Sequence, residues 1–500
     1  MTRMMGRHEP QKDLFSYHID LDKRVRPDNP LRRVAEQIDF TFVREEVAQC
    51  YGQNGNESVD PVVLLKMMFL LFYDDVRSER DLMKIIAERL DYLWFLGYGL
   101  DDEIPHHSVL SKARKRWGTG AFESFFVRVL EQCLRAGLVD GSKIHVDSSL
   151  IDANASKDSV KHGPPELIAA LKQAYQAQES KLEDTSTPAD YQAVNDRLMS
   201  TTDPDAAVTR KSGASARPRY HHHRVVDDAQ GIITAVETTP GSIAENKKLL
   251  AVVQQHERHT QRRVQTVIAD HKYGTNENYL AGQQNGWTTH MGDVLGKQQA
   301  SKQQKGKAPP DIFPESAFTY RAADNVYVCP AGQPMKPRTF RQDKGTWEYA
   351  LPKKVCAACH LRSQCTSATI YGRTIHRHEH QELLDRARTQ AHSPEARRNR
   401  KRRHVVMEQS FADAANNHGF KRSRWRRLWR QQIQDYLIAA IQNIRILLSR
   451  AGKDAAGAAA ALKIVTFEAV SMVFLLLGAL LRAWSRPFRS TLSLARVTAR

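Results

Sequence analysis

Three acidic residues stand in apolar surroundings, where an unpaired carboxylate is costly. Asp147 lies within the segment HVDSSLID, Asp270 follows the apolar run VQTVIA, and Glu408 lies among apolar residues of a long helical segment. Carboxylates on rigid elements are the oxygen ligands that Mg²⁺ prefers, and two such ions about 4 Å apart promote cleavage and transfer of phosphodiesters. Taken singly, each acid also fits a turn or a surface position. Together they indicate metal-dependent phosphodiester chemistry, although spacing alone does not select them among 56 acidic residues.

Four of the six cysteines form a second candidate group. They are Cys329, Cys356, Cys359 and Cys365, spaced C-x26-C-x2-C-x5-C. Four thiolates close a tetrahedral structural Zn²⁺ site, which stabilises a small module that lacks a core of its own. Four reduced, partly buried thiols are the alternative, as is His360 in place of one ligand. Cys50 and Cys133 are expected to be buried small hydrophobic residues.

Positive charge is the third feature that bears on chemistry. The chain has 74 Lys and Arg against 56 Asp and Glu, a net charge of +18, which indicates a polyanionic partner. The segment from Arg397 to Arg430 holds twelve basic and two acidic residues, so it contributes +10, a density suited to a phosphate backbone. RNA or an anionic membrane surface fits the same charge. The residues expected to bind DNA are Lys112, Arg114, Lys115, Arg116, Arg398, Arg402, Lys421, Arg422, Arg424 and Arg427.

Five aromatic side chains near these groups have competing interpretations. Trp425 and Trp429 interleave with arginines, and they either stack on an unpaired base or pack in the core. His221, His222 and His223 are consecutive residues of a predicted strand. Their side chains therefore alternate between its two faces and do not converge on one ion. Structural or DNA-proximal roles are expected for the three histidines.

The elements that position these residues begin with an N-terminal helical region. Residues 30–117 carry apolar side chains at helical spacing, which predicts helices over Pro61–Asp74, Ser78–Leu90 and Ser108–Trp117. The last of these is basic. It is either a helix that contacts DNA, as in a helix-turn-helix module, or a solvated surface helix.

The centre of the chain changes to strand patterns. The predicted strands are 145–152, 263–270 and a hairpin within 219–241 that turns at Asp228–Gly231. The predicted helices are Pro165–Glu183, Glu245–His256 and Asn276–Asn285. The first helix belongs to a polar insertion over 157–215, and Glu245 is expected to be an ordinary acid at a helix N-terminus. Strands that alternate with helices predict an α/β core.

The C-terminal part is predicted to be mainly helical. The triplet Ser393–Glu395 supplies an N-cap, a first-turn proline and an acid, and Gly419 stands where that helix would end. A further helix is predicted over 428–450, with one apolar face. Residues 297–325 are polar and predicted to be mobile. The apolar run Ala469–Leu481 is shorter than the roughly 20 residues of a membrane span, so we expect a buried or partner-facing helix.

The acidic segments also carry a family resemblance. DSSLIDANAS, IADHKYGTNEN and the segment 407–447, which begins MEQSFADAANNHGFKRSRWRRLW, resemble the three catalytic blocks of DDE transposases of bacterial insertion sequences. LRRVAEQIDFTFVRE, VDPVVLLKMMFL, RSERDLMKII, YLWFLGYGLDD and IPHHSVLSKAR resemble the helical domain that precedes that core. The resemblance covers about residues 30–450. It implies a ribonuclease-H-like fold in which Asp147, Asp270 and Glu408 bind two Mg²⁺ or Mn²⁺ ions.

Three features depart from the family pattern. His106 stands where the family often has an acid, and Ala415 where some branches have a lysine, for which Lys421 is an alternative. The last 50 residues match nothing in the family. The cysteine cluster falls between the second aspartate and the glutamate, where similar transposases carry an insertion, which supports a lobe that contacts DNA or a hairpin intermediate.

The resulting expectation is an α/β protein, with an all-α N-terminal domain, a ribonuclease-H-like core and a small cysteine-rich insertion. The expected divisions are 1–29 as an extension, 30–117 as the helical DNA-binding and assembly domain, 140–296 as the first part of the core, 297–372 as the insertion, 373–450 as the second part of the core, and 451–500 as the tail. A transposase implies double-stranded DNA ends and target as partners, and a homo-oligomer in the synaptic complex. It has no small-molecule substrate.

Two alternatives to an active transposase stay open, a non-catalytic DNA-binding protein derived from one and a plain nuclease of the same fold. The chain begins with no apolar run of signal-peptide length, which favours a bacterial cytoplasmic, nucleoid-associated protein with reduced cysteines. Membrane association is not expected.

Overall fold

A computed structural model of the 500-residue chain describes residue 5 and residues 20–52, 57–180, 197–210, 215–292 and 312–450. The chain divides into two compact units, Met1–Ile444 and Arg445–Arg500. The expectations for the tail 451–500, for its apolar run and for most of the polar stretch 297–325 fall outside the described residues. In the described ranges, no helix is long and apolar enough to cross a membrane.

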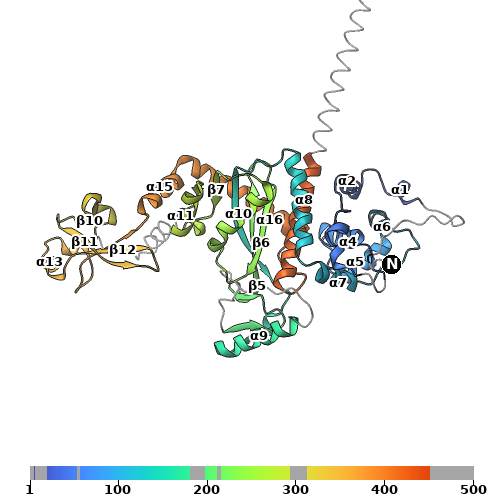
Figure 1. Cartoon of the computed structure of the whole chain (residues 1–500), viewed down its shortest axis with the longest axis horizontal. Coiled ribbons are helices and arrows are strands. Elements are labelled where there is room, and N and C mark those ends of the chain that lie inside the picture. Colours follow the sequence, from blue (N-terminus) through green and yellow to red (C-terminus); the bar gives the residue numbers. More distant parts are fainter. Residues whose placement is uncertain are drawn as a thin grey trace, which may run out of the picture. The chain divides into compact units, whose positions relative to one another are not determined.

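The N-terminal region is helical, as its apolar spacing predicts. Its helices are α1 (Leu21–Arg24), α2 (Pro30–Gln37), α3 (Val43–Glu46), α4 (Pro61–Tyr73), α5 (Glu79–Glu88), α6 (Leu90–Leu96), α7 (Ser108–Trp117) and α8 (Gly120–Arg135). Helix α4 begins at Pro61 because the Asp60 carboxylate accepts a hydrogen bond from the Val62 N–H at 2.9 Å. Nearly all of α4 is buried, because α3, α5, α6 and α7 pack against it (Figure 1). The helix predicted over Ser78–Leu90 ends earlier, at Glu88, because Leu90 is the first residue of α6.

The central sheet is mixed. Its strands are β1 (Lys143–Asp152), β4 (Ala207–Thr209), β5 (Arg217–Asp227), β6 (Ile233–Pro240), β7 (Thr266–Ala269) and β8 (Thr288–His290), in the order β4-β5-β1-β7-β8 with β6 also paired to β5. Strand β1 is antiparallel to β5 and parallel to β7, and β7 is parallel to β8. Fully buried residues such as Ile144 and Val267 form its core, so the predicted strands and hairpin are confirmed.

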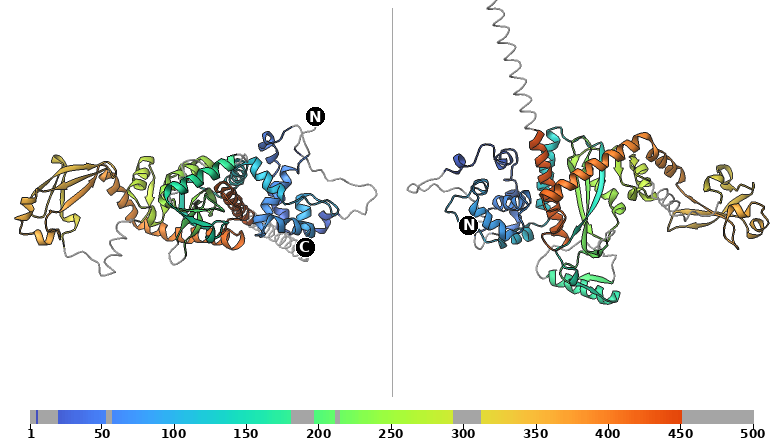
Figure 2. Two further views of the ribbon diagram at one scale, coloured as in Figure 1. Left: turned by 90° about the horizontal axis from the view of Figure 1, so that it is seen from below. Right: turned by 180° about the vertical axis from the view of Figure 1, so that it is seen from behind.

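Helices and short 3-10 turns flank this sheet. They are η3 (Glu245–Lys248), α10 (Leu249–Thr260), η4 (His271–Tyr273), α11 (Asn276–Asn285), α15 (Gln381–His392) and α16 (Pro394–Asn417). The predicted helix from Glu245 is in fact a 3-10 turn followed by α10. Helix α16 begins where Ser393 Oγ accepts from the Ala396 N–H at 3.1 Å, and Gly419 follows its end with a φ of +60°. It runs as one long helix (Figure 2) and contacts β1, β7 and β8.

The insertion over 157–215 has more regular structure than expected. Helix α9 (Pro165–Ser180) confirms the predicted helix. Strands β2 (Val160–His162) and β3 (Leu198–Ser200) pair with each other, and β4 joins the central sheet beside β5. The sequence analysis predicted none of these three strands.

The cysteines lie in a lobe with its own sheet. Its strands are β9 (Thr319–Arg321), β10 (Val326–Val328), β11 (Pro334–Arg341), β12 (Thr346–Ala350) and β13 (Thr374–His378), in the antiparallel order β13-β12-β11-β10-β9. Two short helices, α13 (Lys353–Ala357) and α14 (Arg362–Cys365), carry Cys356 and Cys365, and Cys359 lies between them. The described part of the predicted mobile stretch contains β9, and Phe318 beside it is buried in the core of the lobe. That part is ordered because it supplies core residues.

Candidate active site and cysteine lobe

The two aspartates lie at neighbouring positions of two parallel strands. The register of β1 and β7 pairs Val146 with Ala269, and the next residues along the two strands are Asp147 and Asp270. Parallel neighbours lie about 4.8 Å apart, so this register brings the two backbone positions side by side. Residues that are 123 positions apart in the sequence thus meet at one edge of the sheet.

Asp147 is paired with a cation from α16. The Nη1 of Arg403 lies 2.5 Å from Asp147 Oδ2, and the Ser148 N–H donates to Oδ1 at 2.8 Å. Burial raises the pKa of Asp147, and the Arg403 guanidinium and the Ser148 N–H act in the opposite direction without cancelling it. Glu245 adds negative charge nearby and raises this pKa further.

Asp270 has a different environment, at the start of η4. The backbone N–H and the ring Nδ1 of His271 each lie 2.6 Å from Asp270 Oδ1. Burial acts to raise the pKa of Asp270, but the hydrogen bonds from His271 and the charge of Arg403 outweigh it and hold this pKa below its ordinary value. The two carboxylates therefore have pKa values shifted in opposite directions.

Glu408 is separate from this pair. Its side chain is 68% exposed and lies 3.1 Å from the His404 Nε2, one turn earlier on α16. Arg403, which faces Asp147, is five residues from Glu408, so the two side chains leave the helix about 140° apart. Among the described residues, no group of three or more His, Cys, Asp or Glu side chains is placed to hold a metal ion. The structure does not gather the predicted trio.

A third carboxylate, Glu245, lies beside the aspartates instead. Its Oε2 accepts a hydrogen bond from Ser148 Oγ at 2.5 Å, and its Oε1 lies 2.7 Å from Lys272 Nζ. Its side chain is only 13% exposed. The sequence interpretation, an ordinary helix acid, missed these contacts. The available signal was that Lys272 stands two residues after Asp270 and Ser148 directly after Asp147.

The three consecutive histidines alternate between faces, as predicted. His221 is hydrogen-bonded to Ser148 Oγ at 2.9 Å, and His223 to Thr239 Oγ1 at 2.9 Å. His222 lies on the other face, where its Nδ1 is 2.8 Å from Asp435 Oδ2 and both side chains are fully buried. Burial lowers the pKa of His223 well below its ordinary value.

The candidate DNA-binding residues fall into three groups by exposure. Lys112, Arg116, Arg398, Arg402, Lys421 and Arg422 are exposed, Lys115 and Arg424 are partly buried, and Arg114 and Arg427 are buried. Lys421 donates to Ser149 Oγ at 2.7 Å, two residues after Asp147. Arg402 pairs with Asp228 at 2.5 Å while half its side chain stays exposed. The exposed group is therefore available to a phosphate backbone.

The buried arginines have partners inside the protein. Arg114 pairs with Glu79 and lies 3.9 Å over the Trp425 ring. Arg424 pairs with Asp75. The remaining buried guanidinium, Arg427, lies 3.2 Å from Asp205. Trp425 and Trp429 are 9% and 6% exposed, so in this structure they pack in the core and do not present a face for a base.

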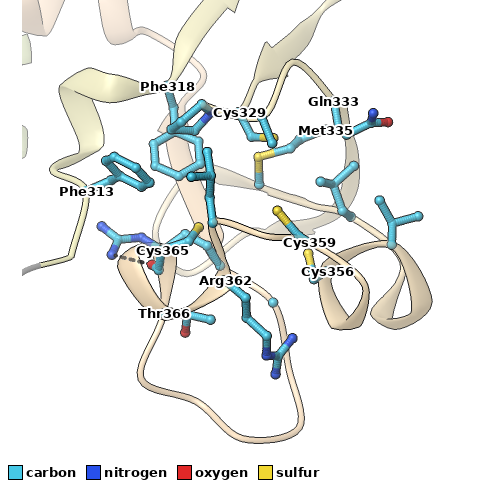
Figure 3. Close-up of a pocket in the computed structure, with 17 residues that line it drawn as sticks. Phe313, Phe318, Cys329, Gln333, Met335, Cys356, Cys359, Arg362, Cys365 and Thr366 are labelled. Carbon is cyan, nitrogen blue, oxygen red and sulfur yellow. Dashed lines mark hydrogen bonds between the residues drawn. The ribbon is translucent and has the colours of Figure 1, made fainter.

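The four cysteines of the lobe line one pocket. Figure 3 shows Cys356 and Cys359 side by side, with Cys329 and Cys365 reaching the same hollow from other segments. Apolar residues such as Phe318 complete the lining. Burial raises the pKa values of the Cys356 and Cys365 thiols, and the neighbouring thiols raise them further. The pocket thus collects four sulfur atoms, although they are not drawn together into a ligand group.

Outside the lobe, the remaining cysteines differ. Cys133 is buried, as predicted, and burial raises its pKa to about 12. Cys50 is exposed at the end of a short 3-10 turn, so the prediction of a buried residue is wrong there.

Comparison with known families identifies two segments of the chain. Residues 19–116 match the family model described as a transposase domain (DUF772), and residues 328–448 match one described as a transposase DDE domain. The chain is therefore an enzyme of the class that cleaves and transfers DNA with the help of metal ions. The two matched segments together support a DDE transposase of the insertion-sequence type.

Two further comparisons, with curated sequences and with solved structures, add no support to this assignment. No curated protein sequence matches the chain. Among solved structures, the chain is similar to one described as the cryo-EM structure of the piggyBac transposase synaptic complex with hairpin DNA. That similarity has 8% sequence identity and a TM-score of 0.29, and it covers 85% of this chain and 73% of the other.

Proposed function

We propose that this transposase moves an insertion sequence by binding its terminal inverted repeats, cleaving the DNA strand at each end and joining the freed ends to a target. Water attacks first and frees a 3′-hydroxyl, and that hydroxyl then attacks target DNA in line. One site serves both steps because only the nucleophile changes. Two ends are held in a homo-oligomeric synaptic complex, and the protein acts on chromosomal DNA in the bacterial cytoplasm.

The observation that carries this proposal is the parallel register of β1 and β7. It brings Asp147 and Asp270 to adjacent positions, with Arg403 beside one carboxylate and His271 beside the other. A first aspartate on a central strand and a second at the end of its parallel neighbour are what a ribonuclease-H-like catalytic core requires. The α16 helix, which carries Glu408, contacts both strands.

The two aspartates fit a divalent metal by their chemistry. Hard ions such as Mg²⁺ or Mn²⁺ take carboxylate oxygens and keep several waters, so two carboxylates on rigid strands suffice for a first site. Asp147 and Asp270 would hold the ions, and Glu408 would have to turn from solvent to join them. When bound, such ions activate the nucleophile and stabilise the leaving oxygen. Asp147 already attracts a cation, Arg403, to the same place.

The exposed basic residues support binding of the DNA backbone. Lys421 lies beside Ser149 on β1, and Arg398, Arg402 and Arg422 are exposed on or after α16. Lys112 and Arg116 would add contacts from α7. Each neutralised phosphate releases counterions, so binding through these residues would weaken steeply with salt.

The cysteine pocket supports a structural Zn²⁺ site in the lobe. Zn²⁺ takes four thiolates at about 2.3 Å. Cys329, Cys356, Cys359 and Cys365 line one apolar pocket, and ion binding would draw their sulfur atoms together. Among the described residues, the core cluster of the lobe has four buried apolar side chains with partly buried ones packed against them, which is a small core for five strands. We propose that zinc completes it.

Cleavage by an Asp147→Asn variant tests the catalytic assignment. The change keeps the size of the side chain and removes the charge, so cleavage of end-containing DNA in Mg²⁺ should fall at least about 1000-fold while binding persists. Asp152→Asn is the matched control, because Asp152 ends the same strand and pairs with Arg219 on β5. Cleavage by Asp147→Asn at the level of the control would refute the assignment.

A further inference from the structure

We propose that Lys272 binds a DNA phosphate beside the catalytic aspartates and that Glu245 positions it there. This inference rests on the transposase function proposed above, since it names a substrate contact of the same site. Neither residue belongs to the three acidic positions that the family resemblance points to.

The placement of Lys272 follows from the start of η4. Asp270 caps this turn by accepting the His271 N–H, so the backbone that carries Lys272 is fixed to the second aspartate. The Lys272 side chain is 62% exposed, whereas its partner Glu245 is 13% exposed. The ammonium group therefore has a nearly buried anchor on one side and solvent on the other.

Glu245 links the surroundings of both aspartates. One of its oxygens accepts from Ser148 Oγ at 2.5 Å, directly after Asp147, and the other holds Lys272 Nζ at 2.7 Å, two residues after Asp270. The Lys272 ammonium is therefore held by one carboxylate and lies within electrostatic reach of Asp270 and Asp147.

The chemistry of the substrate explains the need for this cation. A phosphodiester that approaches the site also meets the Glu245 carboxylate, to which no metal ion is assigned in the proposed function and whose charge repels the phosphate. A lysine ammonium is a compact charge with three donors. One donor is used by Glu245, and two are left for phosphate oxygens. Lys272 would therefore offset the repulsion and hold the phosphate against the aspartates.

The turns around this pair are held firmly. Turns η3 and η4 contact each other, and Asn278 of α11 donates to the Asn246 carbonyl at 3.0 Å and to the Tyr273 carbonyl at 2.9 Å. A second ion pair, Lys247 Nζ to Glu277 Oε2 at 2.5 Å, joins η3 to α11. Lys247 is a matched control for Lys272, because it is also a lysine in this pair of turns and is similarly exposed, at 58%. Its partner, however, lies on α11.

The test compares Lys272→Gln, Lys272→Arg, Glu245→Gln and Lys247→Gln in the full chain. Steady-state cleavage of a labelled inverted-repeat duplex in Mg²⁺ gives kcat and KM, and fluorescence anisotropy across a salt series gives the slope of binding against salt. We expect Lys272→Gln to lower kcat/KM about 100-fold and to reduce the salt slope by about one. Lys272→Arg should restore most of both.

Glu245→Gln separates the positioning role from the contact itself. It should lower kcat/KM about tenfold with the salt slope unchanged, because the ammonium stays but is no longer held. Lys247→Gln should change neither value. Thermal melts verify that each variant is folded. The Lys272 variants are decisive because this side chain is exposed, so its replacement should not disturb the fold.

Several results would overturn the inference. Cleavage and salt slope of Lys272→Gln equal to those of the wild type would do so, as would an equal loss in Lys247→Gln. A wild type that does not cleave the ends refutes the proposed function itself. If the wild type and Lys272→Gln both cleave the ends and Asp147→Asn does not, only the role of Lys272 is refuted.

Discussion

The carboxylate site of the core and the cysteine pocket of the lobe differ in how their polar groups are stabilised. In the core, the chain itself supplies a cation or donor to each acid: Arg403 to Asp147, His271 to Asp270 and Lys272 to Glu245. In the lobe, four thiols line an apolar pocket that adjoins a small core cluster of described residues. The fold of the core should therefore be stable without metal, and the fold of the lobe should depend on it.

Removal of zinc should have the largest effect and should separate the two regions. Structural zinc contributes on the order of 10 kcal/mol to small modules, so Cys359→Ser should lose the metal and the protection of amides in β11 and β12 against hydrogen exchange. Amides of β1 and β5 should exchange as before. Metal analysis should find one zinc ion per chain in the wild type. The control Cys50→Ser should also bind one zinc ion, because the exposed Cys50 thiol lies outside the lobe. A zinc-free wild type with a protected lobe would contradict this comparison.

Rigidity at the carboxylate site gives the next largest effect. A Cβ on Gly274, which ends η4, would lie 1.7 Å from the Gly292 carbonyl oxygen. Backbone must move to admit it, so Gly274→Ala should lower the free energy of unfolding by at least about 3 kcal/mol in urea titrations. In α8, the Gly120→Ala control meets nothing within 4 Å and should leave stability unchanged or slightly raised. Equal stability of the two variants would mean that η4 is not held by this contact.

Acid should weaken the core through a buried histidine. Burial lowers the pKa of His256 to about 4, where it is hydrogen-bonded to Thr234 Oγ1 and the Gly141 carbonyl. Because this value lies below the ordinary one of about 6.5, the unfolded chain binds the proton first, and stability falls as pH drops from about 6.5 toward 4. Between pH 7 and pH 5 the wild type should lose about 2 kcal/mol more than His256→Gln. Parallel losses in urea titrations would exclude this histidine as a cause.

Local signals in the sequence predicted much of the fold. The cap at Ser393 and the stop at Gly419 define α16, and α11 has the predicted bounds Asn276–Asn285. Turns and caps depend on adjacent residues, so the sequence contains their cause. The strands of the polar insertion were missed because their pairing partners are distant: β4 is a strand through its contact with β5.

In the candidate site, only the neighbouring positions of the two aspartates could be predicted from the sequence. Asp147 lies in an apolar strand and Asp270 directly follows one. The parallel pairing of these two strands then brings the two residues to neighbouring positions. Glu245 was missed because its partner Ser148 is 97 residues away. The burial of Arg114 depends on Trp425, more than 300 residues later, and no local pattern reports such a contact.

The most direct test of the central claim is a strand-transfer assay with a labelled fragment that carries one inverted repeat, a target plasmid and Mg²⁺. The wild type should give both a cleaved end and a product in which that end is joined to target DNA, and Asp147→Asn should give neither while it still binds the fragment. Cleavage without a joined product would instead indicate a nuclease. Binding without cleavage by the wild type would indicate a DNA-binding protein and would contradict the account.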